Sequence, residues 1–170
     1  RESDEEAERD RDYYDGKRLT EEEEAVLAQR GQPVVVFNRI KPKIDSLLGF
    51  ERKLRADPKA YPRTPKHEQD AESVTDAIRY VLEDQRFDVK RSEAAENIFI
   101  EGVGALSVTV KESSRGVDVV LNHVPWDRFY YDPYSRRRDF SDAAYMGIVI
   151  WMDATEARQF GEHAEAVIAT

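Results

Sequence analysis

Apolar residues recur with two different periods along this chain, and the period changes near residue 105. Upstream they follow steps of three and four, which is the spacing of an amphipathic helix. Downstream, from Leu106 to Val124, apolar and polar residues alternate, which is typical of half-buried strands. The sequence therefore predicts an α+β fold class, with several N-terminal helices, a small mainly antiparallel sheet and a terminal helix.

Four helices are predicted upstream of the change from their apolar stripes and end signals. Thr20 and Glu23 form a capping box, which starts a helix by satisfying its first free N–H groups. Asn38 is a good N-cap for the helix that carries the next apolar stripe. The predicted helices run from Thr20 to Gly31, from Asn38 to Asp57, from Thr64 to Leu82 and from about Asp88 to Gly102.

Two upstream segments have a weaker pattern. Residues 1–12 are almost wholly charged, with Ala7 as the single apolar residue, so we expect a frayed or solvated helix there. The apolar run Val34–Phe37 is either a strand or a buried extended segment, because periodicity alone does not separate the two.

The downstream part predicts strands joined by turns. Leu106–Lys111 and Val117–Val124 flank a turn cluster and form an antiparallel hairpin. Phe129–Tyr131 is a candidate third strand. Tyr145–Met152 is almost continuously apolar, which indicates a strand buried on both faces. Asp153 then starts the last helix, whose predicted face carries Ala157, Phe160, Ala164 and Val167.

Charge is distributed unevenly along the 170 residues, which hold 26 Lys and Arg against 35 Asp and Glu, for a net charge of −9. Residues 1–30 are net −6, residues 31–66 are net +6, and residues 67–170 are net −9. We predict an acidic N-terminal arm and helix over residues 1–30 and an α+β body over residues 31–170. Segments of opposite sign can pair within the chain, between subunits or with other molecules.

The sequence lacks the signals of several functional classes. The chain has no cysteine, which excludes a disulfide scaffold and thiolate metal sites. It has no signal peptide, no apolar run long enough to span a membrane and no glycine-rich phosphate loop after a strand. Its three histidines share no metal-ligand spacing, so we predict no cofactor. Because the chain begins with Arg1 and its last helical pattern stops at Thr170, we expect part of a longer protein.

One acidic cluster lies between the predicted strands and admits two interpretations. Nucleases place carboxylates near strand ends to bind Mg²⁺, which makes a Mg²⁺-dependent nuclease or another nucleic-acid-processing domain the alternative function. The favoured interpretation is that these side chains accept hydrogen bonds from nearby backbone in turns. The cluster consists of Asp127, Asp132, Asp139 and Asp142.

Basic and aromatic residues provide candidates for a protein interface. Arg136, Arg137 and Arg138 stand beside the acidic cluster, and an ion-pair network within or between chains is favoured over nucleic-acid binding. Trp126 and Tyr130 belong to a dense aromatic set, which more often anchors a core or a protein interface than stacks on bases.

Three further basic residues fall on one side of the helix after Asn38. Lys41, Arg52 and Arg55 lie within roughly 60° of one another at about 100° per residue. We expect them to face an acidic surface of a neighbouring subunit. A generic oligomeric scaffold is a third functional possibility that these residues leave open.

Several long motifs, in the same order, resemble the N-terminal region of portal proteins from short-tailed, podovirus-type phages. The likeness extends from about residue 11 to about residue 155. The motifs are Tyr13–Lys17 with Leu19-Thr20, Asn38–Asp45, Asp57–Pro65, Val124–Arg136, Asp139–Ala143, Gly147–Val149 and Trp151-Met152.

This resemblance implies a structural role in the virion and not an enzymatic one. Portal proteins form a ring, usually of twelve subunits, at one capsid vertex, and double-stranded DNA passes through it during packaging and ejection. The terminase motor, the capsid and tail factors contact the ring, which assembles in the host cytoplasm. By this resemblance the chain corresponds to the N-terminal part of a portal subunit, in its outer wing.

Overall fold

The computed structural model describes residues 2–113, 116–137 and 139–158, which fall into two compact units. The first unit comprises residues 1–126 and the second residues 127–170. Helices followed by two antiparallel two-stranded sheets confirm the predicted α+β class. The predicted domain boundary at residue 30 stays a prediction.

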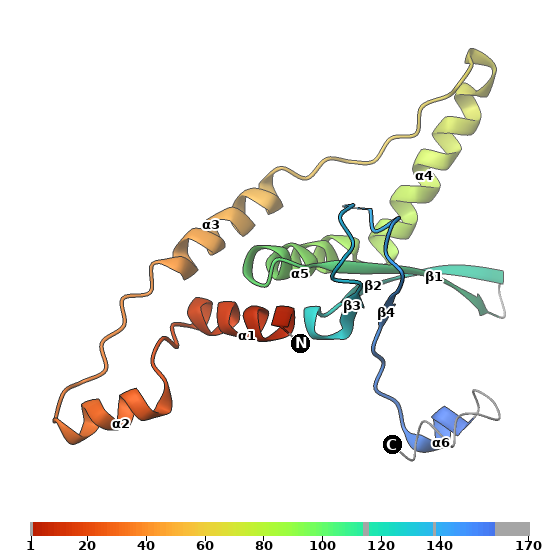
Figure 1. The fold of residues 1–170 in the computed structure, drawn as a ribbon. Coiled ribbons are helices and arrows are strands. Elements are labelled where there is room, and N and C mark those ends of the chain that lie inside the picture. Colours follow the sequence, from red (N-terminus) through yellow and green to blue (C-terminus); the bar gives the residue numbers. More distant parts are fainter. Residues whose placement is uncertain (1, 114–115, 138, 159–170) are drawn as a thin grey trace. The chain divides into compact units, whose positions relative to one another are not determined.

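Helices dominate the first unit, where they precede its single hairpin (Figure 1). The four predicted helices are present, and the segment between the second and third of them is extended, as its prolines indicate. A short 3₁₀ turn, η1, comes before the longest helix. The elements are α1 (Glu2–Asp15), α2 (Glu21–Gln29), α3 (Ile40–Lys53), η1 (Pro65–His67), α4 (Glu68–Asp84) and α5 (Phe87–Ile100).

The predicted start signals act at two of these helices. Thr20 and Glu23 form the complete capping box of α2, because the side chain of each accepts a hydrogen bond from the backbone N–H of the other. The Asn38 side chain accepts hydrogen bonds from the N–H groups of Ile40 and Lys41, at 3.0 and 3.2 Å. By contrast, Thr64 makes no side-chain cap at η1.

The structure shows the solvated helix that was one of the two expectations for the charged N-terminus, with most of its described side chains exposed. Residues 2–15 form a helix, and Ala7 on it is buried. Val34–Phe37 is extended and belongs to no strand, and Phe37 is 79% exposed.

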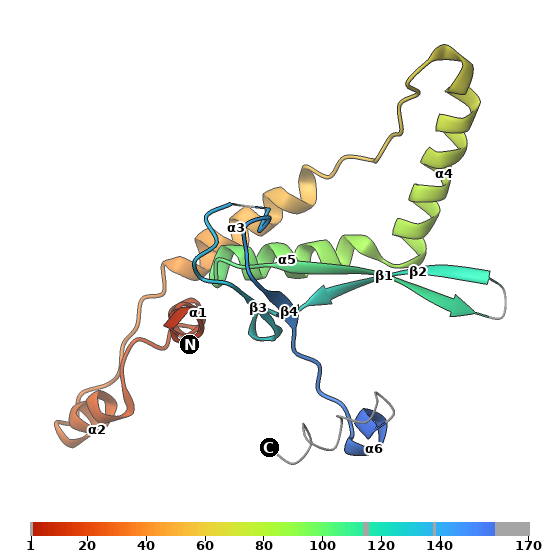
Figure 2. The same cartoon turned by 45° about the vertical axis from the view of Figure 1, so that its right-hand side comes forward.

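The predicted hairpin is confirmed and packs against α5. Strands β1 (Ala105–Ser113) and β2 (Gly116–Val124) pair antiparallel, with Val108 opposite Leu121. Leu121 and Val124 are buried, and the Lys90 ammonium donates a hydrogen bond to the Leu121 carbonyl. In Figures 1 and 2 the hairpin runs beside α5 in both views. The core of the first unit lies where α1, α3, α5 and β2 meet.

In the second unit, β3 (Phe129–Tyr131) pairs antiparallel with β4 (Met146–Ile148). The third strand is thus confirmed, but the prediction of a doubly buried strand over Tyr145–Met152 is wrong. Ile150 is 67% exposed and Trp151 is 79% exposed. A two-stranded sheet has no central strand, so apolar residues in this run lack the two neighbours that the pattern implied.

The last helical element is short within the described residues. Helix α6 (Ala154–Ala157) starts with a hydrogen bond from the Ala157 N–H to the Asp153 carbonyl, at 2.9 Å. The remainder of its predicted face, at Phe160, Ala164 and Val167, lies outside the described residues. Across the described part of the chain, no helix has the length and apolar character needed to cross a bilayer.

Candidate subunit interface

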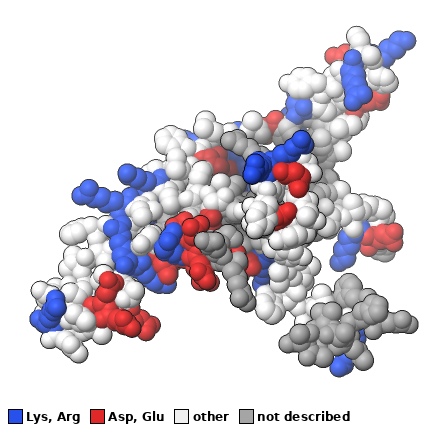
Figure 3. All heavy atoms as spheres, in the orientation of Figure 1, with Lys and Arg blue, Asp and Glu red and all other residues white. Residues whose placement is uncertain are grey.

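The basic segment 31–66 includes α3, and Figure 3 shows Lys and Arg side chains gathered where α3 begins, beside the acidic side chains of α1. Lys41 lies in the first turn of α3, and its ammonium is 2.7 Å from the Tyr14 hydroxyl and 4.0 Å from the ring centroid. That hydrogen bond raises the pKa of Lys41 above its ordinary value. Lys41 therefore joins α3 to α1 within the chain.

Tyr14 is the centre of this contact between α1 and α3. Its ring is buried, and its hydroxyl donates a hydrogen bond to Asp45 at 2.7 Å. Its carbonyl accepts a hydrogen bond from the Asn38 side chain, also at 2.7 Å. Burial and the Asp45 carboxylate raise the pKa of Tyr14, and Lys41 opposes them. Through these contacts, the buried Tyr14 holds the start of α3 against α1.

Arg55 is bound within the chain as well. Its guanidinium donates to the Asp88 carbonyl at 3.0 Å and to the Ser92 hydroxyl at 2.6 Å. It also lies 3.2 Å from the Asp88 carboxylate and 3.7 Å from that of Glu51. Arg55 thereby joins the end of α3 to the start of α5, and its predicted contact with a neighbouring subunit stays a prediction.

Glu51 completes this junction. Its carboxylate accepts hydrogen bonds from the Arg91 guanidinium at 2.7 Å and from the Ser92 hydroxyl at 2.9 Å. Burial alone raises the pKa of Glu51, but the hydrogen bonds from Arg91 and Ser92 and the charges of Arg91 and Arg55 outweigh it. The pKa of Glu51 is therefore lowered from its ordinary value of 4.5.

This lowered pKa predicts a stability contribution that is lost in acid. Because the folded pKa lies below the unfolded one, the contribution is complete above about pH 4.5 and disappears as the pH falls through the folded pKa. Urea unfolding of the chain and of Glu51→Gln should differ most near neutral pH, and the difference should shrink as the pH falls below about 4.5 and through the folded pKa. The exposed Glu72→Gln is the control, and a pH-independent difference for Glu51→Gln would contradict the assignment.

Arg52 differs from these two residues because it is exposed in the last turn of α3. Its side chain makes no hydrogen bond or ion pair to any other described residue. A cation near a helix C-terminus is favoured by the helix dipole, which suits this position without requiring a partner. Of the three predicted α3 cations, Arg52 is the one whose charge remains available to another molecule.

The acidic cluster of the second unit stabilises turns, as the favoured interpretation predicted. Asp132 is buried and accepts the N–H groups of Tyr134 and Ala144, at 2.9 and 3.0 Å. Asp142 accepts the Ser135 hydroxyl at 2.6 Å and the Arg136 N–H at 2.9 Å, and these bonds lower its pKa.

The other two acidic residues do not build a metal site with them. Asp139 accepts hydrogen bonds from the N–H and hydroxyl of Ser141, which lower its pKa. Asp127 is exposed. Within the described residues, no group of three His, Asp or Glu side chains is placed to hold a metal ion.

Arg136 and Arg137 form hydrogen bonds in place of the ion pairs that were expected within the chain. Asp142 accepts the backbone N–H groups of Arg136 and Arg137, and the Arg137 guanidinium donates to the Ser141 hydroxyl at 3.1 Å. No described ion pair joins either guanidinium to the acidic cluster, because the turn directs the carboxylates toward backbone. Arg138 lies outside the described residues. An ion pair with another subunit stays a prediction for this run.

Aromatic side chains form the interior of the second unit. The rings of Phe129, Tyr131 and Phe140 lie close together, with the Tyr131 and Phe140 centroids 5.0 Å apart. Tyr130 points to the other face, is 49% exposed, and lies over Gly147. Trp126, at the end of the first unit, is half-buried. Tyr130 and Trp126 remain interface candidates.

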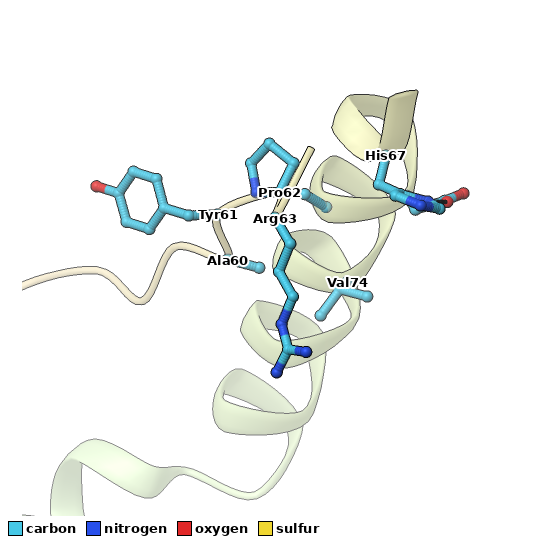
Figure 4. A pocket seen from close by; sticks show the side chains of 8 residues that line it. Ala60, Tyr61, Pro62, Arg63, His67 and Val74 are labelled. Atoms are coloured by element: carbon cyan, nitrogen blue, oxygen red, sulfur yellow. Dashed lines mark hydrogen bonds and ion pairs between the residues drawn. The ribbon is translucent and has the colours of Figure 1, made fainter. Parts of the chain in front are cut away.

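An open groove lies where the proline-rich segment passes the start of α4 (Figure 4). The Ala60 N–H donates to the Thr75 hydroxyl at 3.0 Å, which attaches this segment to α4. In Figure 4 Val74 faces the groove, whereas the Tyr61 ring points away from α4. The lining of this groove is mainly apolar, and the groove is open to the surface. It is therefore the line along which the extended segment packs on α4.

Sequence reasoning missed the ion pair between α1 and α5. The Arg11 guanidinium lies 2.5 Å from the Glu101 carboxylate, which is fully buried, and 3.1 Å from Glu96. The Asn97 side-chain N–H donates to the other oxygen of Glu101, and its Oδ1 accepts a hydrogen bond from Nε2 of His123 at 2.6 Å. No local pattern reveals pairs that are 85 or 90 residues apart. The charged character of residues 1–12 was the only signal.

Comparison with known proteins decides the family. All of residues 1–170 match the phage P22-like portal proteins. The chain belongs to this family. A portal protein of Helicobacter pylori bacteriophage KHP30 is 19% identical to it over 132 residues, which cover 77% of this chain and 22% of that protein. The predicted portal resemblance is confirmed, and portal-family membership identifies a structural protein and not the alternative nuclease.

Proposed function

We propose that this portal-family chain forms part of the outer wing of one subunit in a portal ring. The observation that carries the proposal is the family match along the whole chain. The complete subunits would assemble at one capsid vertex, and double-stranded DNA would pass through the ring during packaging and ejection. Terminase, capsid and tail factors would contact the complete protein, in the host cytoplasm and then in the virion.

The charge of the segment supports a position away from tightly held DNA. Its net charge is −9, and the basic residues on α3 are partly used within the chain. Affinity for DNA grows with each phosphate that a Lys or Arg side chain neutralises. A wing of this charge would not retain the DNA that the ring must let pass.

The exposed basic end of α3 supports a head-to-tail contact with the next subunit. A cyclic ring joins two different surfaces of each subunit, so surfaces of opposite charge suit it. Arg52 supplies such a charge, and we propose that it faces acidic side chains of the neighbour. The other proposed interface residues are Lys41, Arg55, Arg136, Arg137, Arg138, Trp126 and Tyr130.

Reversing the charge of Arg52 should therefore impair ring assembly without unfolding the subunit. In the portal protein that contains this segment, Arg52→Glu should reduce the ring fraction by about tenfold in native mass spectrometry, because like charges then face each other. Arg52→Lys keeps the charge and should assemble normally. If Arg52→Glu assembles as well as Arg52→Lys, then Arg52 does not face an acidic surface.

A further inference from the structure

We propose that α2 of one subunit docks on the outer face of α3 in the next subunit. This inference rests on the proposed ring function and names the two surfaces that meet. It begins from a property of α3, which presents apolar side chains on both sides. Leu48 is buried toward the body of the first unit, whereas a second stripe of apolar residues points outward.

The outward stripe on α3 is apolar and basic. Leu47, Phe50 and Leu54 follow steps of three and four, so they lie along one side of the helix. They are 48%, 61% and 78% exposed. Lys43 lies one turn before Leu47 on the same stripe and Lys53 lies beside it, and both are exposed. Neither lysine has a hydrogen bond or ion pair within the described residues.

Helix α2 carries the complementary surface, which is apolar and acidic. A shallow groove formed by α2 and the residue Leu19 before it is lined by Leu19, Glu22, Glu23, Val26 and Leu27. No residue of α2 is buried, and its first turn consists of four glutamates with no base in the last turn. No hydrogen bond or ion pair in the described structure joins α2 to another helix or strand.

A helix of nine residues is too short to be stable in water without packing of its apolar side. Its capping box and glycine end nevertheless define it sharply. What α2 lacks is therefore a surface against which Val26 and Leu27 can pack. An unpartnered helix of this kind, between two irregular segments, is suited to reach another molecule (Figure 1).

Charge selects the partner among the surfaces of this chain. Two α2 helices would bring their glutamates together, and two α3 stripes would bring their lysines together, so neither surface pairs with its own copy. An α2 helix against the α3 stripe pairs apolar with apolar and acid with base. This contact joins unlike surfaces and can be repeated from subunit to subunit, as the head-to-tail contacts of a cyclic ring are.

Cross-linking tests this contact directly, because the segment contains no cysteine. We would introduce Val26→Cys and Leu47→Cys together into a cysteine-free version of the portal protein that contains it. After treatment with a short bis-maleimide, denaturing electrophoresis should show a ladder of covalent multimers. Each single variant should give none, and Val26→Cys with Ser73→Cys, which places the second thiol on an exposed position of α4, should also give none.

A ring that forms normally in the microscope but yields no ladder would overturn the docking of α2 on α3 and leave the ring function standing. A ladder from Val26→Cys alone would also overturn it, because α2 would then contact its own copy. If no ring forms in the unmodified protein, the proposed function itself fails.

A charge exchange provides a second, independent readout. Glu22→Lys and Lys43→Glu should each lower the ring fraction by about tenfold, because each places like charges in the contact. The two changes together should restore assembly. Glu22 is chosen because Glu23 also forms the capping box of α2. Failure of the double variant to recover, with both single variants still folded, would contradict the pairing.

Discussion

Replacing Arg11 with methionine will lower the free energy of unfolding of the 170-residue chain by about 3 kcal/mol. The reason is the charge that the substitution leaves behind. The Glu101 side chain is fully buried, and the Arg11 guanidinium is its only cationic partner among the described residues. Asn97 at 3.2 Å supplies a single remaining hydrogen bond, which does not neutralise a carboxylate.

The pKa of Arg11 shows the balance at this contact. Burial lowers that pKa, but the hydrogen bonds and charges of Glu101 and Glu96 more than offset it, so the pKa is raised. Breaking a buried pair by removing one partner costs more than replacing both partners with apolar groups. The double variant Arg11→Met with Glu101→Leu should therefore recover part of the loss.

Urea unfolding of the two variants measures this effect. Arg9→Met is the matched control, because Arg9 lies on the same helix, is exposed and makes no ion pair among the described residues. It should change the unfolding free energy by less than about 0.5 kcal/mol. If Arg11→Met costs no more than Arg9→Met, then α1 is not anchored to α5 by this pair.

Replacing Gly104 with alanine should destabilise the chain by about 2 kcal/mol, because the new methyl group has no space. A Cβ at this position collides with the carbonyl oxygen of Ala94 and lies 2.6 Å from Cγ1 of Ile98. Both atoms belong to α5, and a backbone carbonyl in a helix cannot move aside without breaking the helix. The connection from α5 into β1 would have to shift instead.

Gly147→Ala is the informative comparison for this prediction. There the added Cβ meets the phenol ring of Tyr130, which is half-exposed and can rotate away. The cost should stay below about 1 kcal/mol. Thermal unfolding of the two variants measures the contrast, and equal losses would mean that the approach of Gly104 to α5 is not as close as the structure shows.

The sequence predicted those elements whose cause is local. The apolar stripe from Ile40 to Leu54 specified α3, the capping box of Thr20 specified α2, and the alternation from Leu106 to Val124 specified the hairpin. In each case the period or the cap lies within a few consecutive residues, so no knowledge of distant contacts is needed.

Long-range pairing could not be predicted in the same way. Arg11 with Glu101, and Glu51 with Arg91, join residues that are 90 and 40 positions apart in the chain, beyond the reach of any local period. The error at Tyr145–Met152 has the same origin. An apolar run shows what a strand can bury but not whether a neighbouring strand is present to cover it.

The sequence also predicted the candidate subunit interface only in part. Lys41, Arg52 and Arg55 share one side of the helical projection, yet Lys41 binds Tyr14 and Arg55 binds α5, which leaves Arg52 exposed. Leu47 belonged to the same predicted apolar stripe as Leu48, yet Leu47 is 48% exposed and Leu48 is buried, because periodicity does not show which side of a helix is covered.

Electron cryo-microscopy of the portal protein that contains this segment would show where the segment lies in the assembled ring. We expect a closed ring with a central channel, in which α1, α3, α5 and the β1–β2 hairpin lie at the outer rim and α2 lies against α3 of the next subunit. A ring whose channel wall is formed by this segment, or a protein that forms no ring, would rule out the proposed place of this segment in the outer wing.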